Sequence, residues 1–250
     1  MLLLHDFPHT GNNIVGSGYH SMLDDPNFFL APDGQSDAEA ELEATIRGMY
    51  RPQDHNQATA VVPDKEITDN NNFPPQPGDD HPQCRFPARY AWLRTRLAPS
   101  EFSPQAVPCP SFDEWLTNIA PKKIILVFPA AYLNSPASMF GHTLLRLESN
   151  EQGTEGTILG YGASFAAFTG DDGGIAFAYK GLFGGYIGAY SVSPYYKEIR
   201  RYSDLEHRDI WEYTLNFNPQ QVDRIVRHLW ELEKNYFDYY FFDENCALHL

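Results

Sequence analysis

The chain has 250 residues and a formal net charge of −15, and its aromatic residues include 15 Tyr and 17 Phe. This length allows one folded domain with a sizeable core and some attached segments. The acidic balance argues against a nucleic-acid partner, because neutralising phosphates needs a basic surface. Residues 1–80 hold 14 of the 33 acidic side chains but only 3 of the 18 basic ones. The rest of the chain is therefore nearly balanced and would not be repelled strongly by an anionic membrane.

The first residues, MLLLHDFPHTG, have no basic region and too short an apolar stretch for a signal peptide. No apolar run along the chain approaches the roughly 20 residues of a membrane-spanning helix. Two interpretations remain: a cytoplasmic protein, or a sequence that begins downstream of its true start. The cysteine pattern described below favours the second.

Residues 1–83 are predicted to form an acidic N-terminal extension with one helix. Ser36 can cap this helix, with Glu39 completing a capping box, and the helix should end before Pro52. Residues 52–83 are rich in Pro, Asn, Asp and Gln, which predicts a disordered linker.

Residues 84–250 mix helical and strand patterns, which predicts an α+β domain with packed helices. The strand at 123–130, KIILVFPA, is a continuous apolar run of the kind found in buried strands. Asn218 followed by Pro219 predicts the start of a long amphipathic helix. The other expected elements are helices at 86–97 and 111–119 and strands at 142–148, 157–165 and 210–217.

The last residues, ENCALHL, are typical of the first turn of a helix, and no stop signal follows them. We therefore expect the sequence to be a fragment whose last helix is cut.

The chain has three cysteines. Cys84 and Cys109 lie in similar loop settings beside short helices, and a disulfide between them would stabilise the fold by roughly 3–4 kcal/mol. Such a bond needs an oxidising compartment such as the periplasm. The alternative is that both are ordinary reduced thiols. With a disulfide in place, Cys246 is left over, and a leftover thiol in an exported protein is a candidate reactive group.

Cys246 is predicted to begin a helix, where backbone N–H groups stabilise a thiolate and can form an oxyanion hole. An activated thiol also needs a nearby imidazole. His142 is the best candidate among nine histidines, because it begins a strand after a loop of small residues. His228 and His249 are weaker: the first lies on a regular amphipathic helix, and the second should point along the same helix as Cys246. The alternative is a buried, inert cysteine and a structural histidine.

The segments GHTLLRLE and DENCALHL resemble the permuted papain-like superfamily, which includes the lecithin:retinol acyltransferase group. There the histidine comes first, on a core strand, and the cysteine comes last, opening a helix after an asparagine. More specifically, the chain resembles the Lnb N-terminal periplasmic domain family, formerly a domain of unknown function. The similar segments are DDPNFFLAPDG, AELEAT, CRFPARYAWL, LVFPAAYLNSPASMFGHTLLRLE, GLFGGYIGAYSVSPYYKEIRRYSDLEHRDIWEY and FDYYFFDENCALHL.

This resemblance implies a bacterial lipoprotein N-acyltransferase with a permuted papain-like catalytic domain at 84–250, in which helices pack on an antiparallel sheet core. Cys246 would be the nucleophile and His142 the general base, with no cofactor. The implied partners are a phospholipid or lipoprotein acyl donor, a lipoprotein N-terminus as acceptor, and the bacterial membrane surface. The implied location is the periplasmic face of the inner membrane, with the membrane attachment outside this sequence.

The resemblance also implies a third, orienting residue. In permuted papain-like proteins it lies on the strand after the histidine strand, which here offers Tyr161 and Ser164. Asn245 is a further candidate that could orient the thiol or the oxyanion, with a helix N-cap as its alternative role.

Two aromatic stretches have two interpretations each. Residues 181–196 should form tight turns packed on the sheet, or else an apolar groove for an acyl chain or a bilayer contact. Residues 236–242 are either core or groove wall. The acidic side chains Asp204, Glu206 and Asp209 lack accompanying His or Cys ligands, so we expect a structural acidic loop and no metal.

Two other function classes use the same residues. One is a papain-like thiol hydrolase, such as a cell-wall amidase or endopeptidase, with water as the acceptor. The other is a binding module that keeps the papain-like frame without chemistry.

Overall fold

The computed structural model describes residues 20–53, 80–130, 143–149, 160–168, 179–200, 209–240 and 246–249. Contacts between Cα atoms divide the chain into two compact units, Met1–Glu114 and Trp115–Leu250. Helix α4 (Pro110–Ile119) crosses the point of division. The first unit contains η1 (Pro26–Phe28), α1 (Ala38–Met49), α2 (Pro82–Arg85) and α3 (Pro87–Arg96).

Helix α1 is capped by Asp37 and not, as predicted, by Ser36. The Asp37 carboxylate accepts the N–H groups of Glu39 and Ala40 at 3.0 and 2.9 Å. The Ser36 hydroxyl instead donates to the Asp33 carbonyl at 3.3 Å. With Asp37 as the cap, Glu39 stands at the second helical position, one residue too early for a capping box.

A buried ion pair connects α1 to α3. The side chains of Arg89 and Glu41 are fully buried and bonded to each other, and Arg89 also donates to the Thr45 hydroxyl at 3.2 Å. The guanidinium carbon lies 3.9 Å from the ring centroid of Phe86 and 4.5 Å from that of Phe28. Ring faces and the carboxylate together replace the water that this cation loses.

The Glu41 carboxylate also holds the chain that precedes α1. It accepts the backbone N–H groups of Leu30 at 2.9 Å and Ala31 at 2.8 Å. One carboxylate therefore serves a cation and two backbone donors, which satisfies it fully in the core. The neighbouring Arg85 donates to the Asn27 carbonyl, and burial, followed by the charge of Arg89, lowers the pKa of Arg85.

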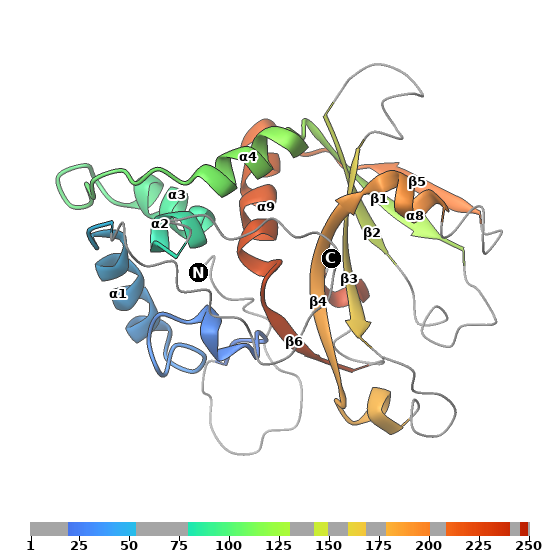
Figure 1. Cartoon of the computed structure of the whole chain (residues 1–250), viewed down its shortest axis with the longest axis horizontal. Coiled ribbons are helices and arrows are strands. Elements are labelled where there is room, and N and C mark those ends of the chain that lie inside the picture. The colour runs from blue at the N-terminus through green and yellow to red at the C-terminus, as the bar shows by residue number, and fades with distance from the viewer. Residues whose placement is uncertain are drawn as a thin grey trace. The chain divides into compact units, whose positions relative to one another are not determined.

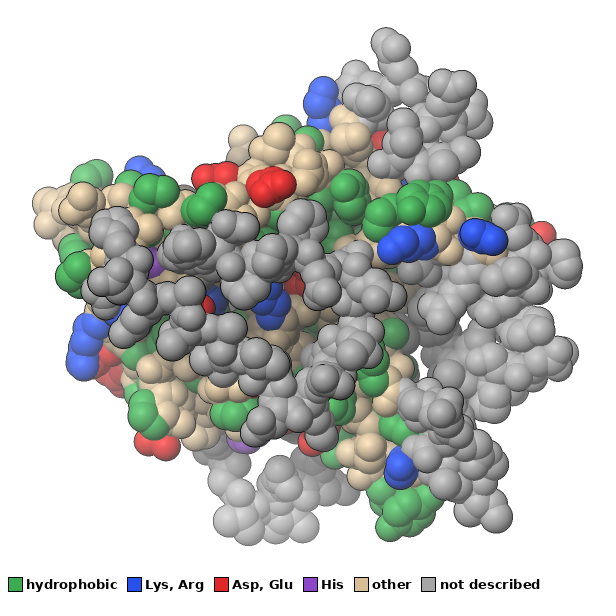
Figure 2. All heavy atoms as spheres, viewed as in Figure 1, with side chains coloured by type: hydrophobic (Ala, Val, Ile, Leu, Met, Phe, Trp, Pro, Cys, Tyr) green, Lys and Arg blue, Asp and Glu red, His purple; other side chains and the backbone are tan. Residues whose placement is uncertain are grey.

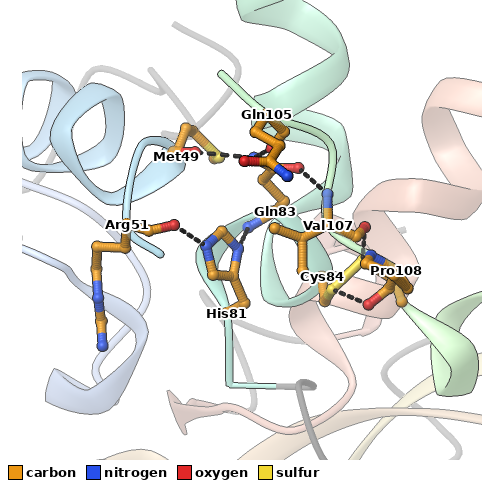
Figure 3. The surroundings of a disulfide bond; sticks show 9 residues. Met49, Arg51, His81, Gln83, Cys84, Gln105, Val107 and Pro108 are labelled. Carbon is orange, nitrogen blue, oxygen red and sulfur yellow. Dashed lines mark hydrogen bonds between the residues drawn. A yellow bond between two sulfur atoms is a disulfide. The ribbon is translucent and has the colours of Figure 1, made fainter. Parts of the chain in front are cut away.

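Cys84 of α2 and Cys109 are joined by a disulfide, with their Cα atoms 5.1 Å apart (Figure 3). The disulfide joins α2 to the segment before α4, and we call this contact the junction. The adjacent Gln83 strengthens it, because its side-chain amide bonds to three backbone groups of neighbouring segments. It donates to the carbonyls of Met49 and Gln105, both at 2.8 Å, and accepts the Val107 N–H at 3.0 Å. Helix α2 begins at Pro82, so the last residues of the expected linker form part of this junction.

The second unit is built on a six-stranded antiparallel sheet in the order β5-β1-β2-β3-β4-β6 (Figure 1). This confirms the α+β class with an antiparallel sheet core. The described helices of this unit include α8 (Tyr195–Ile199), α9 (Pro219–Leu232) and α10 (Cys246–His249). The strands are β1 (Lys123–Pro129), β2 (Leu144–Glu148), β3 (Tyr161–Phe168), β4 (Tyr186–Pro194), β5 (Ile210–Thr214) and β6 (Tyr236–Tyr239).

One face of the sheet buries an aliphatic cluster under α8. Ile125 and Val127, two residues apart on β1, share this face with Leu144, the register partner of Val127 on β2. Tyr195 of α8 closes the cluster and is itself buried. The period of two along β1 follows from the alternation of side chains in a strand.

Some of the predicted elements differ from the structure. Strand β5 ends at Thr214, whereas the sequence predicted 210–217. Strand β3 begins at Tyr161 and runs to Phe168, whereas the sequence predicted 157–165. Residues 236–239, predicted only as core or groove wall, form the edge strand β6. Its alternation is clear in the structure, since Phe237 and Tyr239 are buried while Asp238 between them is exposed.

We expect Glu41→Gln to destabilise the first unit by about 3 kcal/mol or more, because it leaves the Arg89 cation buried without its counter-charge. The matched control is Glu43→Gln on the same helix. Glu43 pairs with Arg47, but both side chains are exposed, so the loss should stay below about 0.5 kcal/mol. Urea unfolding followed by circular dichroism measures both changes. Equal effects of the two substitutions would contradict the assigned role of the buried pair.

Candidate thiol site

Cys246 is the first residue of α10, a helix of four residues that packs against β3 (Figure 1, the red turn beside β3). Because Cys84 and Cys109 are bonded to each other, Cys246 is the one cysteine of the chain outside the disulfide. A helix this short has little stability of its own. Its position must therefore come from contacts with the rest of the unit.

Those contacts are made by His249, the last residue of α10. Its ring is buried and lies 4.1 Å from the ring centroid of Phe165 on β3 and 4.8 Å from that of Phe237 on β6. Tyr190 on β4 donates its hydroxyl to the His249 backbone carbonyl. Three strands thus hold the C-terminal end of α10, by ring packing and by one hydrogen bond that satisfies a helix-end carbonyl.

The sheet register brings these rings together. Phe165 pairs directly with Tyr190, and Gly188 pairs with Phe237. A Cβ atom at Gly188 would lie 2.4 Å from the Cζ atom of Phe165, so only glycine leaves room for that ring. Tyr239 completes the cluster, with its ring 5.7 Å from that of Phe165 in a stacked arrangement.

Two of the predicted site residues, His142 and Asn245, lie outside the described residues, as does the side chain of Cys246. The structure places Cys246 through its backbone, at the start of α10. The pairing of its thiol with the His142 imidazole stays a prediction.

Ser164 lies on the face of the sheet that is turned away from α10. The pairing of β3 with β4 runs without interruption from Tyr161 to Phe168, so neighbouring side chains point to opposite faces. Phe165 points to α10, and Ser164 therefore points away from it. The Ser164 hydroxyl is 3.1 Å from that of Ser191, its register partner on β4.

Tyr161 shares the face of Phe165 but is displaced along the strand. Four residues separate the two positions, which corresponds to about 13 Å in a strand. Ser164 is thus on the face opposite to α10, and Tyr161 is remote from His249.

His249 and Tyr190 were not anticipated as the residues that hold α10. His249 was expected to point along its helix, whereas its ring is turned inward onto Phe165. The sequence does contain one indication of the cluster. Gly188 and Tyr190 are two residues apart, so in a strand they share one face, and the small residue beside the large ring is typical of a face that packs against other rings. The partners of that strand are not evident from one sequence.

The opposite face of the sheet carries charge. Arg146 on β2 is buried and pairs with Glu212 at 3.1 Å and Glu148 at 3.4 Å. Tyr195 of α8 donates to Glu212 at 2.8 Å, and the Arg146 guanidinium lies 5.4 Å from the Tyr195 ring centroid. The aliphatic cluster under α8 and this charge network are on one face, and the rings that hold α10 are on the other.

No group of three or more His, Cys, Asp or Glu side chains within the described ranges could hold a metal ion. Asp204 and Glu206 of the acidic loop fall outside them. None of the helices in the described part of the chain is both long and apolar enough to cross a bilayer.

An antiparallel sheet with a cysteine-led helix held on one face defines the second unit as a small α+β domain. The family model described as the Lnb N-terminal periplasmic domain matches residues 111–250. The chain therefore belongs to the Lnb N-terminal periplasmic domain family. A second model, described as a domain of unknown function, matches residues 3–61. Neither a curated protein nor a solved structure matches the chain.

The family match has two consequences for the site. Its range includes both His142 and Cys246 but neither cysteine of the disulfide. The family description places the domain in the periplasm, which is the kind of oxidising compartment in which a structural disulfide persists.

We expect Phe165→Ala to destabilise the second unit by about 3–5 kcal/mol, because it removes a fully buried ring that contacts α10 and two neighbouring strands. Amide hydrogen exchange in α10 should rise together with this loss. Phe168→Ala, on the same strand but 43% exposed, is the matched control and should cost less than about 1 kcal/mol. Unchanged exchange in α10 of the Phe165 variant would contradict the assigned anchoring role.

Proposed function

We propose that the chain carries the catalytic centre of a thiol-dependent acyltransferase that matures bacterial lipoproteins. Cys246 is the nucleophile and His142 the general base. The observation that carries the proposal is the position of Cys246 at the start of α10, a helix that a dedicated ring cluster holds on the sheet. The family match over 111–250 and the resemblance to permuted papain-like enzymes support the same assignment.

The proposed reaction has two halves. His142 takes the proton from the Cys246 thiol, and the thiolate attacks the ester carbonyl of a membrane lipid. The carbon–oxygen ester bond breaks, the leaving alkoxide takes the proton from His142, and the acyl chain stays on Cys246 as a thioester. The N-terminal amine of the lipoprotein then attacks the thioester. An amide forms, the thiolate leaves, and the proton lost by the amine passes to His142 and back to sulfur.

The surroundings of α10 favour an acyltransferase over a hydrolase. The described side chains that hold the helix are aromatic: the rings of Phe165 and Phe237 lie against His249, and the Tyr190 hydroxyl binds its carbonyl. An apolar setting of this kind, continued to the Cys246 end of the helix, would limit the access of water, the competing acceptor for a thioester. A cell-wall hydrolase, by contrast, needs a cleft that binds polar sugars and peptides.

Asn245 is the proposed oxyanion-stabilising residue. It directly precedes the first residue of α10, so it stands at the N-cap position in the sequence. From there a side-chain amide can donate to a negative oxygen that develops beside Cys246. The location of Ser164 on the face turned away from α10 disfavours it for this role, and the displacement of Tyr161 disfavours that residue.

Cys246→Ala in the full-length protein should reduce acyl transfer to a lipoprotein peptide by at least about a thousandfold. Intact-mass measurement should find an acyl adduct on the wild type and none on the variant. His142→Gln should remove the adduct while leaving the fold unchanged. Full transfer by Cys246→Ala would exclude the covalent route. Release of products from peptidoglycan, without any from lipid, would instead identify a hydrolase, and no turnover of either would indicate a binding module.

Asn245→Ala should lower the transfer rate roughly 100-fold. Asn245→Asp separates the two roles of the residue, because aspartate caps a helix as well as asparagine but has no N–H to donate. We expect Asn245→Asp to be as inactive as Asn245→Ala. Ser164→Ala is the control and should stay within about threefold of wild type. Recovery of activity in Asn245→Asp would reduce Asn245 to a structural cap.

A further inference from the structure

Three large apolar side chains are exposed on the connection between β3 and β4. Tyr179 is 64% exposed, Leu182 45% and Phe183 67%. We call these residues the apolar tip. Figure 2 shows hydrophobic side chains gathered at this place, at the lower right of the view, beside a basic side chain. Single exposed apolar residues are ordinary, but a cluster of three within five positions is a candidate interaction site.

The apolar tip has a defined backbone. Residues 179–182 form a helical turn, with the Phe183 N–H bonded to the Tyr179 carbonyl at 3.1 Å. The Gly185 N–H bonds to the Lys180 carbonyl at 2.7 Å, and Gly184 has a φ of 74°. These are the features of a Schellman C-cap, in which glycine takes the left-handed conformation. The outward direction of the tip side chains is therefore fixed by backbone hydrogen bonds.

The turn that carries the tip also contacts the segment that leads to Cys246. A Cβ atom at Gly184 would lie 2.4 Å from the Cζ atom of Tyr240, so the glycine backbone rests directly on that ring. Tyr240 follows β6, whose Tyr239 pairs with Tyr186 at the start of β4. The apolar tip thus lies at the end of the sheet where the chain leaves β6 toward Cys246.

The composition of the tip matches a bilayer interface. Tyrosine, phenylalanine and leucine enter the boundary between headgroups and acyl chains, and a neighbouring lysine can reach lipid phosphates. Lys180 is exposed, and residues 179–185 contain no acidic side chain. The Tyr179 and Phe183 ring centroids are 4.8 Å apart, so the two rings present one compact apolar end. Such an end on a strand connection is suited to insertion between lipids.

Another exposed aromatic pair has a different setting. Trp211 and Tyr213 are 58% and 57% exposed, but they lie on the edge strand β5 with Glu212 between them. Their side chains share one face of β5, and the Glu212 carboxylate between them in the sequence points to the other face, where it pairs with Arg146. They provide a matched set of exposed rings without the features of the apolar tip.

We propose that the apolar tip inserts into the surface of a phospholipid bilayer and thereby brings to the lipid the end of the sheet at which Tyr240 leads on toward Cys246 in the sequence. The purpose of this contact rests on the proposed function, since an enzyme that takes an acyl chain from a membrane lipid must reach the ester at the interface. The contact itself does not require that chemistry.

The test is binding of the 250-residue chain to vesicles of phosphatidylethanolamine and phosphatidylglycerol, measured by co-sedimentation. Phe183→Ser should lower the partition coefficient about fivefold, and the triple variant Tyr179→Ser, Leu182→Ser, Phe183→Ser roughly 100-fold. The double variant Trp211→Ser, Tyr213→Ser should bind like the wild type. Circular dichroism and the melting temperature of each variant check that the fold is kept.

Cys246→Ala separates this inference from the proposed function. It should bind vesicles like the wild type, so loss of chemistry with intact binding removes only the proposed function. Equal vesicle binding by wild type and triple variant would overturn the inference. So would absence of vesicle binding together with dimerisation that the triple variant abolishes, since the tip would then be a contact between copies of the chain.

Discussion

The candidate site depends on the packing of one short helix against rings from three strands. An isolated helix of four residues does not persist in water, because nucleation costs more than its few hydrogen bonds return. Helix α10 exists because His249 lies on Phe165 and Phe237 and because Tyr190 binds its last carbonyl. The position of Cys246 is therefore a property of the sheet, and the glycine at 188 that admits the Phe165 ring is as necessary as the rings themselves.

The two faces of the sheet have different roles. The face under α8 combines aliphatic packing with the buried Arg146 and its carboxylate partners. This arrangement favours one register, because a slip would separate Arg146 on β2 from Glu212 on β5. The other face carries the ring cluster and the cysteine-led helix. Two neighbouring residues of β3 show the difference between the faces. Phe165 contacts α10, whereas Ser164, one residue earlier, points to the opposite face and lies beside Ser191.

Local patterns in the sequence predicted much of the fold. Asn218 and Pro219 marked the start of α9, and the apolar run after Lys123 marked β1, because caps and buried strands depend on neighbouring residues. The sequence was less informative where distant segments decide the outcome. The alternation of buried and exposed side chains in β6 arises from its pairing with β4, which the sequence does not reveal. The inward direction of the His249 ring likewise depends on rings more than ten residues away. The predicted pairing of Cys246 with His142 would be of this second kind, and the prediction rests mainly on family resemblance.

The disulfide of the first unit has a consequence for how the protein matures. Three cysteines can form three different single disulfides, and two of these would consume Cys246. The bond between Cys84 and Cys109 spans 25 residues, and both precede Cys246 in the chain by more than a hundred. During export from the N-terminus, the correct partners reach the oxidising compartment first and can pair before Cys246 arrives. The order of the cysteines along the chain therefore favours the bond between Cys84 and Cys109 over the two that would consume Cys246.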